Sequence, residues 1–141
     1  NPKSESYMAV DYGLTALLIR ACLAAEIQPK FVYLSSLGTQ ENSPSAYLQA
    51  RYLAENELIE SGLTYVIARP SFISGPSREE RPMERVGAIA TDGALGMLAA
   101  LGLKGPQNKY ASLDAKALAA GLIRTSLGES TNVIVEATDL R

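Results

Sequence analysis

Apolar residues along this chain recur first at helical spacing and then in short uninterrupted runs, a pattern that predicts helices alternating with buried strands. Residues 6–26 carry apolar side chains at three- and four-residue steps, which predicts an amphipathic helix ended by Pro29. Residues 31–35 (FVYLS) then form a run that suits a strand covered on both faces. The apolar positions of the helix are Val10, Leu14, Leu17, Leu18, Ala21 and Ala25.

The middle of the chain predicts a second helix and a second strand. Ser43 is placed to cap the helix, with Pro44 at its first position, and the helix runs to about residue 61, where Gly62 supplies a stop. Residues 64–69 (TYVIAR) are β-branched and aromatic, which favours a strand that ends at Pro70.

The last part of the chain predicts two more helices and a final strand. In order, the pattern indicates a loop over residues 75–82, a glycine-broken helical region over 86–103, a turn over 105–108, a helix over 112–127 stopped by Gly128, and a short strand over 132–136.

Strands separated by helices of this length predict an α/β fold with a parallel sheet and right-handed crossovers. We find no repeat or linker, so we expect residues 1–141 to form a single α/β unit of three parallel strands with flanking helices. The strand at 31–35 would then lie at an open edge with unpaired backbone groups. We expect a further part of the fold, or a second copy of the chain, to cover that edge.

Composition fits a soluble, cytoplasmic protein and removes several classes of function. The chain is 47% hydrophobic with a net charge of -2, which gives no electrostatic reason to expect a nucleic acid partner. With one cysteine, Cys22, and no histidine, an intrachain disulfide, a cysteine metal cluster and Ser-His or Cys-His catalysis are excluded. No signal peptide is visible, and residues 86–103, which contain Asp92, are short for a membrane span, so we expect no membrane partner.

The remaining candidate chemistry lies between the first two strands. Tyr47 and Arg51 share one helix face at i and i+4, so the cation's field favours the phenolate and makes the tyrosine a usable proton donor or acceptor. Ser35 or Ser36, at the end of the preceding strand, would hold a substrate oxygen. A plainer interpretation packs Tyr47 in the first turn and pairs Arg51 with Glu55 on the solvent side.

The stretches FVYLSSLG, AYLQAR and ARPSFISGPSREERP together resemble the atypical short-chain dehydrogenase/reductase superfamily, most closely its Tat-interacting oxidoreductase-type and NmrA-like members. The resemblance covers nearly the whole chain but only the C-terminal half of the family's doubly wound, Rossmann-like fold. Nothing matches the glycine-rich turn that holds the cofactor pyrophosphate in that fold. The chain therefore resembles a partial NAD(P)-binding domain that lacks its N-terminal half.

The resemblance implies roles for particular residues. Tyr47 would be the catalytic acid/base, assisted by Ser35 or Ser36, and Arg51 stands where the family has a lysine that binds the nicotinamide ribose. Arginine keeps the charge but presents a wider planar fork. Asp11 stands where many relatives carry asparagine, and we interpret it as a solvated acid in the first turn of its helix. The implied contacts with NADP or NAD are Tyr47, Arg51, Pro70, Ser71, Phe72, Ile73 and Arg81.

The resemblance implies that the complete protein transfers a hydride between a nicotinamide cofactor and a carbonyl or alcohol substrate, while this chain alone is inactive. The alternative is a non-catalytic cofactor-sensing or protein-interaction module of the same fold. From the open strand edge and the two amphipathic helices we also expect a homo-oligomer, most simply a two-fold dimer.

Overall fold

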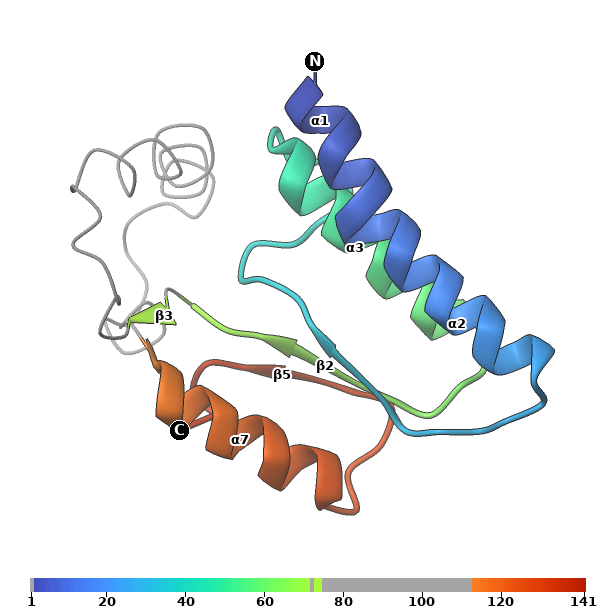
Figure 1. The fold of residues 1–141 in the computed structure, drawn as a ribbon. Helices are drawn as coiled ribbons and strands as arrows, with labels where there is room; N and C mark the ends of the chain where they lie inside the picture. Colours follow the sequence, from blue (N-terminus) through green and yellow to red (C-terminus); the bar gives the residue numbers. More distant parts are fainter. Residues whose placement is uncertain (1, 72, 75–112) are drawn as a thin grey trace.

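The structure is a computed structural model that describes residues 2–71, 73–74 and 113–141. Three parallel strands form the central sheet, with two helices against one face and one helix against the other (Figure 1). The mixed α/β class and the parallel sheet predicted from the sequence are confirmed. The predicted helical region at 86–103, with the loop and turn around it, lies outside the described residues.

A continuous helix opens the described chain, and it comprises α1 (Pro2–Ser6), the π-helical segment η1 (Tyr7–Leu14) and α2 (Thr15–Ala24). We call Pro2–Ala24 the N-terminal helix. The other elements are β1 (Phe31–Leu34), α3 (Ala46–Glu60), β2 (Tyr65–Arg69), β3 (Ile73–Ser74), β4 (Leu113–Asp114), α7 (Ala115–Leu127) and β5 (Val133–Glu136).

The helix boundaries agree with the sequence prediction at Gly62, and they differ from it where α3 and α7 begin. α3 begins after Ser45 and not at Pro44, and the Ser43 hydroxyl accepts the Ser45 N–H at 3.3 Å. Gly62 adopts φ 78°, the left-handed conformation that ends a helix, as predicted. α7 begins after Asp114, whose carboxylate accepts the Lys116 N–H at 3.1 Å.

The sheet has the strand order β1-β2-β5, and both pairings are parallel. Leu34 lies opposite Ala68, and Arg69 lies opposite Glu136, so the strands end together at one edge of the sheet. β1 is an edge strand among the described residues, as predicted. The pairing of β3 with β4, two residues each, was not predicted from the sequence.

Two hydrophobic clusters hold the helices to the sheet. The N-terminal helix and α3 pack on the β1-β2 face, and α7 packs on the opposite face (Figure 1). Cys22, predicted on an apolar helical pattern, packs against the first cluster. The first cluster consists of Ile19, Tyr33, Ala54, Leu58, Leu63 and Ile67, and the second of Ala68, Leu118 and Leu140.

Candidate functional site

The predicted site residues gather at the carboxyl ends of β1 and β2. Ser35 and Ser36 follow β1, and Pro70 and Ser71 follow β2 at the same edge of the sheet. The Arg51 guanidinium in α3 donates from Nη1 to the Leu34 carbonyl oxygen at 2.6 Å, so the start of α3 is fixed over the end of β1. In open parallel sheets this edge is where ligands bind.

The two serines, which the sequence does not separate, differ in their hydrogen bonds. The Ser35 side chain is buried, and its Oγ lies 3.3 Å from Thr39 Oγ1. Since Thr39 Oγ1 donates its own proton to the Ser36 carbonyl oxygen at 2.7 Å, Ser35 is the donor in that pair. The Ser36 hydroxyl is half-buried, and its one hydrogen bond within the described part of the chain goes to the Leu37 carbonyl oxygen, at 3.4 Å. Of the two serines, Ser36 is therefore the one whose hydroxyl is available to bind a ligand.

Tyr47 lies in the first turn of α3 and is half-buried. The Tyr7 ring in η1 meets the Tyr47 ring in an edge-on contact, with the centroids 5.4 Å apart. The central carbon of the Arg51 guanidinium lies 5.0 Å from the Tyr47 ring centroid, a cation–π distance. With the described residues the Tyr47 hydroxyl makes no hydrogen bond. The two predicted partners are thus in contact, and the hydroxyl keeps its hydrogen-bonding capacity.

Arg51 joins three elements through its planar fork. Beyond the bond to Leu34, its Nη1 donates to the Tyr33 hydroxyl at 3.2 Å, and its Nη2 lies 2.9 Å from Asp11 Oδ1. Its Nε is buried and has no hydrogen-bond partner among the described residues. Arg51 therefore ties α3 to β1 and to the N-terminal helix, a geometry that suits a guanidinium better than a lysine ammonium.

Two interpretations made from the sequence are wrong. Asp11 is not a solvated acid in a first turn, because its helix begins at Pro2 and its half-buried carboxylate pairs with Arg51. Arg51 does not pair with Glu55, which is buried and forms a two-point ion pair with Arg69 at the end of β2.

Sequence reasoning also missed the tyrosines that complete this cluster. Tyr7 and Asp11 stand four residues apart on the N-terminal helix, as Tyr47 and Arg51 do on α3, so each meets its counterpart across the helix pair. This matched i, i+4 spacing was available in the sequence, but the pairing of the two helices was not. Tyr33 is buried and belongs to a run that is otherwise apolar, so the sequence pattern indicated only a core residue. The hydrogen bond that its hydroxyl accepts from Arg51 was not predicted.

The charge of Arg51 acts on the Tyr33 phenol, and Arg51 in turn is affected by both tyrosines that it touches. Burial raises the pKa of the Tyr33 phenol, and the neighbouring Arg51 opposes this rise without cancelling it, so Tyr33 stays protonated at neutral pH. Burial lowers the pKa of Arg51, but the stabilisation it gains from Tyr47 and Tyr33 in their ionised forms outweighs that effect and the net pKa is raised. Arg51 is a fixed positive charge beside Tyr47.

The end of β2 is also held by hydrogen bonds and an ion pair. The Pro70 carbonyl oxygen accepts the Leu37 N–H at 3.0 Å, and Ser71 is buried beside it. The hydrogen bonds from Arg69 to Glu55 raise the pKa of Arg69 and attach this end of β2 to α3. Among the cofactor contacts implied by the resemblance, Ile73 begins β3, while Phe72 and Arg81 lie outside the described residues.

Replacing Arg51 by lysine should lower the free energy of unfolding by about 1–3 kcal/mol, because a single ammonium cannot reach Asp11, Tyr33 and Leu34 together and leaves buried polar groups unpaired. Urea denaturation measures the change. Arg20→Lys is the matched control, since the Arg20–Glu57 pair is exposed and contributes little. Equal stability of Arg51→Lys and the natural chain would show that Arg51 does not brace these elements.

Compared with protein-family models and with curated proteins, the chain matches none. The functional conclusion therefore rests on the chemistry of the residues at the β1-β2 edge and on the motif resemblance.

Proposed function

We propose that this chain is the C-terminal part of a doubly wound, Rossmann-like domain, and that the complete protein is an NAD(P)-dependent oxidoreductase resembling the atypical short-chain dehydrogenases/reductases. One observation carries the proposal. At the carboxyl edge of a parallel sheet, the Tyr47 hydroxyl makes no hydrogen bond with the described residues and stands beside the fixed charge of Arg51. A phenol in this setting is suited to proton transfer.

Tyr47 and Ser36 would have different roles at the substrate oxygen, Tyr47 as the proton donor and Ser36 as a hydrogen-bond donor. A bound nicotinamide would supply or accept the hydride at the substrate carbon. In the reductive direction Tyr47 donates its phenolic proton to the carbonyl oxygen, which becomes the hydroxyl of the alcohol product, and the phenolate regains a proton from solvent. Ser36 donates a hydrogen bond to the same oxygen, in place of its long bond to the Leu37 carbonyl. Ser35 supports this arrangement through Thr39 and does not reach the substrate.

The residues fit NADP or NAD only in part. Pro70 and Ser71 lie at the strand end where the nicotinamide would pass, with Phe72, Ile73 and Arg81 as further proposed contacts. Arg51 does not fit the role of the family lysine as a ribose ligand, because its terminal N–H groups are directed to Leu34, Tyr33 and Asp11. We assign Arg51 an electrostatic and positioning role and no contact with the cofactor.

A second candidate is a cofactor-sensing or protein-interaction module without turnover. The Asp11–Arg51 ion pair favours it, since the carboxylate offsets much of the positive charge that would stabilise a Tyr47 phenolate. In both proposals the protein is cytoplasmic, with no nucleic acid and no membrane as partner. The oxidoreductase and the cofactor-sensing module also take a small-molecule ligand.

This chain alone should bind NADPH too weakly to measure at micromolar concentrations, whereas the complete protein should bind it. The reason is that nothing in this sequence matches the glycine-rich turn and helix N-terminus that hold a dinucleotide pyrophosphate. Calorimetric titration of NADPH into both proteins measures the difference. Micromolar binding by the chain alone contradicts the partial-domain proposal. A complete protein that binds neither NADPH nor NADH in the same titration contradicts the oxidoreductase and the cofactor-sensing module, and leaves the protein-interaction module.

A further inference from the structure

The loop after β1 is attached to β2 through alternate residues. The Ser35 N–H donates to the Ala68 carbonyl oxygen at 2.7 Å, and the Leu37 N–H donates to the Pro70 carbonyl oxygen at 3.0 Å. Ser35 and Leu37 are each 4% exposed, whereas Ser36 between them is half-buried. Successive residues of an extended chain point to opposite sides, so the Ser36 side chain lies on the face opposite to those of Ser35 and Leu37.

Thr39 closes a turn on the carbonyl group of Ser36. The Thr39 N–H donates to the Ser36 carbonyl oxygen at 3.3 Å, and Thr39 Oγ1 donates to the same oxygen at 2.7 Å. Gly38, the third residue of this turn, has φ 83°, as a type II turn requires at that position. The Thr39 side chain therefore adds a second, shorter bond to the main-chain bond that closes the turn.

The Thr39 hydroxyl is also the centre of a buried hydrogen-bond chain. Thr39 is 5% exposed, and its Oγ1 accepts the Ser35 hydroxyl at 3.3 Å while it donates to the Ser36 carbonyl oxygen. Linked hydrogen bonds polarise and strengthen one another. The peptide unit between Ser36 and Leu37 is thus held at both ends, at its carbonyl by Thr39 and at its N–H by Pro70.

We propose that Thr39 is a positioning residue that holds the Ser36 hydroxyl toward the substrate oxygen, a role that rests on the oxidoreductase function proposed above. Because the peptide unit after Ser36 is fixed, the direction in which its side chain leaves the main chain is fixed too. Misplacing a reacting or binding group by about 1 Å costs up to about 10²-fold in rate. Thr39 acts through the main chain of Ser36 and does not touch the substrate.

Steady-state kinetics of the complete protein, with the carbonyl compound that it reduces best, tests this role. Thr39→Val keeps the branched shape but loses the hydroxyl, so kcat and kcat/KM should fall together by about 10- to 100-fold. Thr39→Ser restores a hydroxyl and should recover activity to within about threefold of the natural protein. An active protein whose Thr39→Val variant keeps the natural kcat would overturn the role of Thr39.

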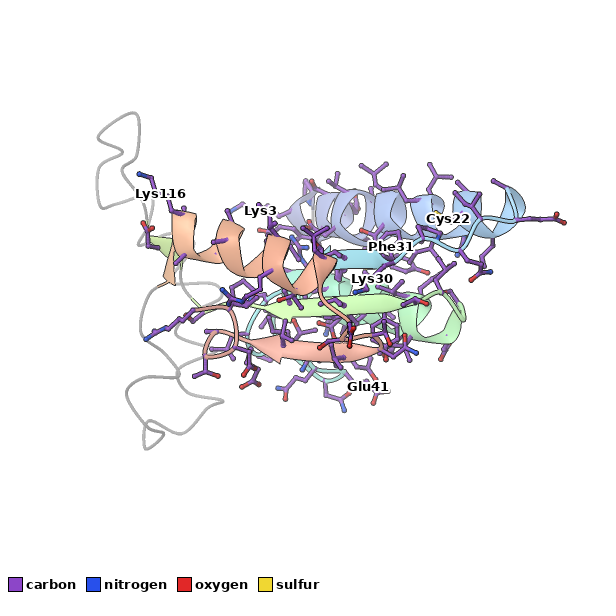
Figure 2. All side chains as sticks on the ribbon, turned by 90° about the horizontal axis from the view of Figure 1, so that it is seen from below. Lys3, Cys22, Lys30, Phe31, Glu41 and Lys116 are labelled. Carbon is purple, nitrogen blue, oxygen red and sulfur yellow. The ribbon has the colours of Figure 1, made fainter. Side chains whose placement is uncertain are left out.

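Thr125→Val is the matched control and should leave the kinetics unchanged. Thr125 is half-buried, and its Oγ1 also donates to a main-chain carbonyl oxygen, that of Gly121, at 2.7 Å. It lies on α7, however, and not in the loop after β1. Figure 2 shows Lys116, near the start of α7, far from Glu41, which belongs to that loop.

A double variant separates positioning from a merely structural role. If Thr39 acts through Ser36 alone, adding Thr39→Val to Ser36→Ala should lower kcat by less than about threefold beyond the effect of Ser36→Ala. The same loss in both backgrounds would show that Thr39 supports the fold in general, and this result would contradict the proposal.

Amide hydrogen exchange of this chain, followed by NMR, tests the same contact without any turnover. The Leu37 N–H should exchange at least about tenfold faster in Thr39→Val, because the turn that holds it loses its side-chain bond. The Phe31 N–H donates to the Thr64 carbonyl oxygen at the other end of β1, so its unchanged exchange would show that the variant is folded. Equal exchange of the Leu37 N–H in both chains would refute the contact.

Failure of the proposed function and failure of this inference give different results. A complete protein that reduces no carbonyl compound overturns the proposed function and the catalytic role of Thr39 together. Natural kinetics of Thr39→Val in an active protein overturns the role of Thr39 alone.

Discussion

Replacing Arg69 by leucine should lower the free energy of unfolding by about 3–5 kcal/mol, one of the largest losses we expect from a single substitution in this chain. Arg69 donates from Nε and Nη2 to the Glu55 carboxylate, which is 1% exposed. Leucine fills much of the same space but leaves that carboxylate buried without its cation. Chemical denaturation of the natural chain and the variant measures the difference.

Two further variants isolate the ion pair as the cause. The double variant Arg69→Leu with Glu55→Leu should recover most of the lost stability, because apolar residues of similar size replace a buried pair at little cost. Arg20→Leu removes one partner of the exposed Arg20–Glu57 pair and should cost less than about 1 kcal/mol. A double variant as unstable as Arg69→Leu alone would place the effect elsewhere than in the pair.

Tyr47→Phe should lower reductase activity of the complete protein by about 10²- to 10⁴-fold, the range expected when a general acid is removed. The substitution deletes only the hydroxyl, and the ring keeps its contacts with Tyr7 and Arg51. Cofactor affinity and stability should therefore change little. Steady-state kinetics, with an NADPH titration beside them, separates the two effects.

Tyr52→Phe is the matched control for that experiment. Tyr52 lies on the same helix and is half-buried, and its hydroxyl also makes no hydrogen bond with the described residues. The control should keep its activity. Turnover at the natural rate by Tyr47→Phe would remove Tyr47 from the chemistry and leave the non-catalytic proposal.

The repeating pattern of the chain was sufficient to predict the parallel α/β architecture. The apolar run at 31–35 and the β-branched stretch at 64–69 are local signals, and both became strands of the predicted sheet. Gly62 predicted a helix end because glycine readily adopts the left-handed conformation, and in the structure its φ is 78°. Such features depend on near neighbours in the sequence, so a single sequence contains them.

The contacts of the site depend on distant partners, and these were predicted poorly. In the sequence alone Asp11 has the features of a surface acid. Its partner Arg51 lies on α3, and the two side chains meet only because α3 packs beside the N-terminal helix. Glu55 lies within reach of Arg51 on one helix, yet its partner Arg69 comes from the next strand. Local spacing therefore identified Tyr47 and Arg51 as neighbours, while the rest of the charge pairing required the packed structure.

Hydride transfer itself is the most direct test of the proposed function. The complete protein would be incubated with NADPH carrying deuterium at the transferable position of the nicotinamide and with a panel of aldehydes and ketones, and the alcohols would be examined by mass spectrometry. We predict that an alcohol product gains one deuterium and that Tyr47→Phe nearly abolishes its formation. NADPH binding without deuterium in any product across the panel would contradict catalysis and support the cofactor-sensing module.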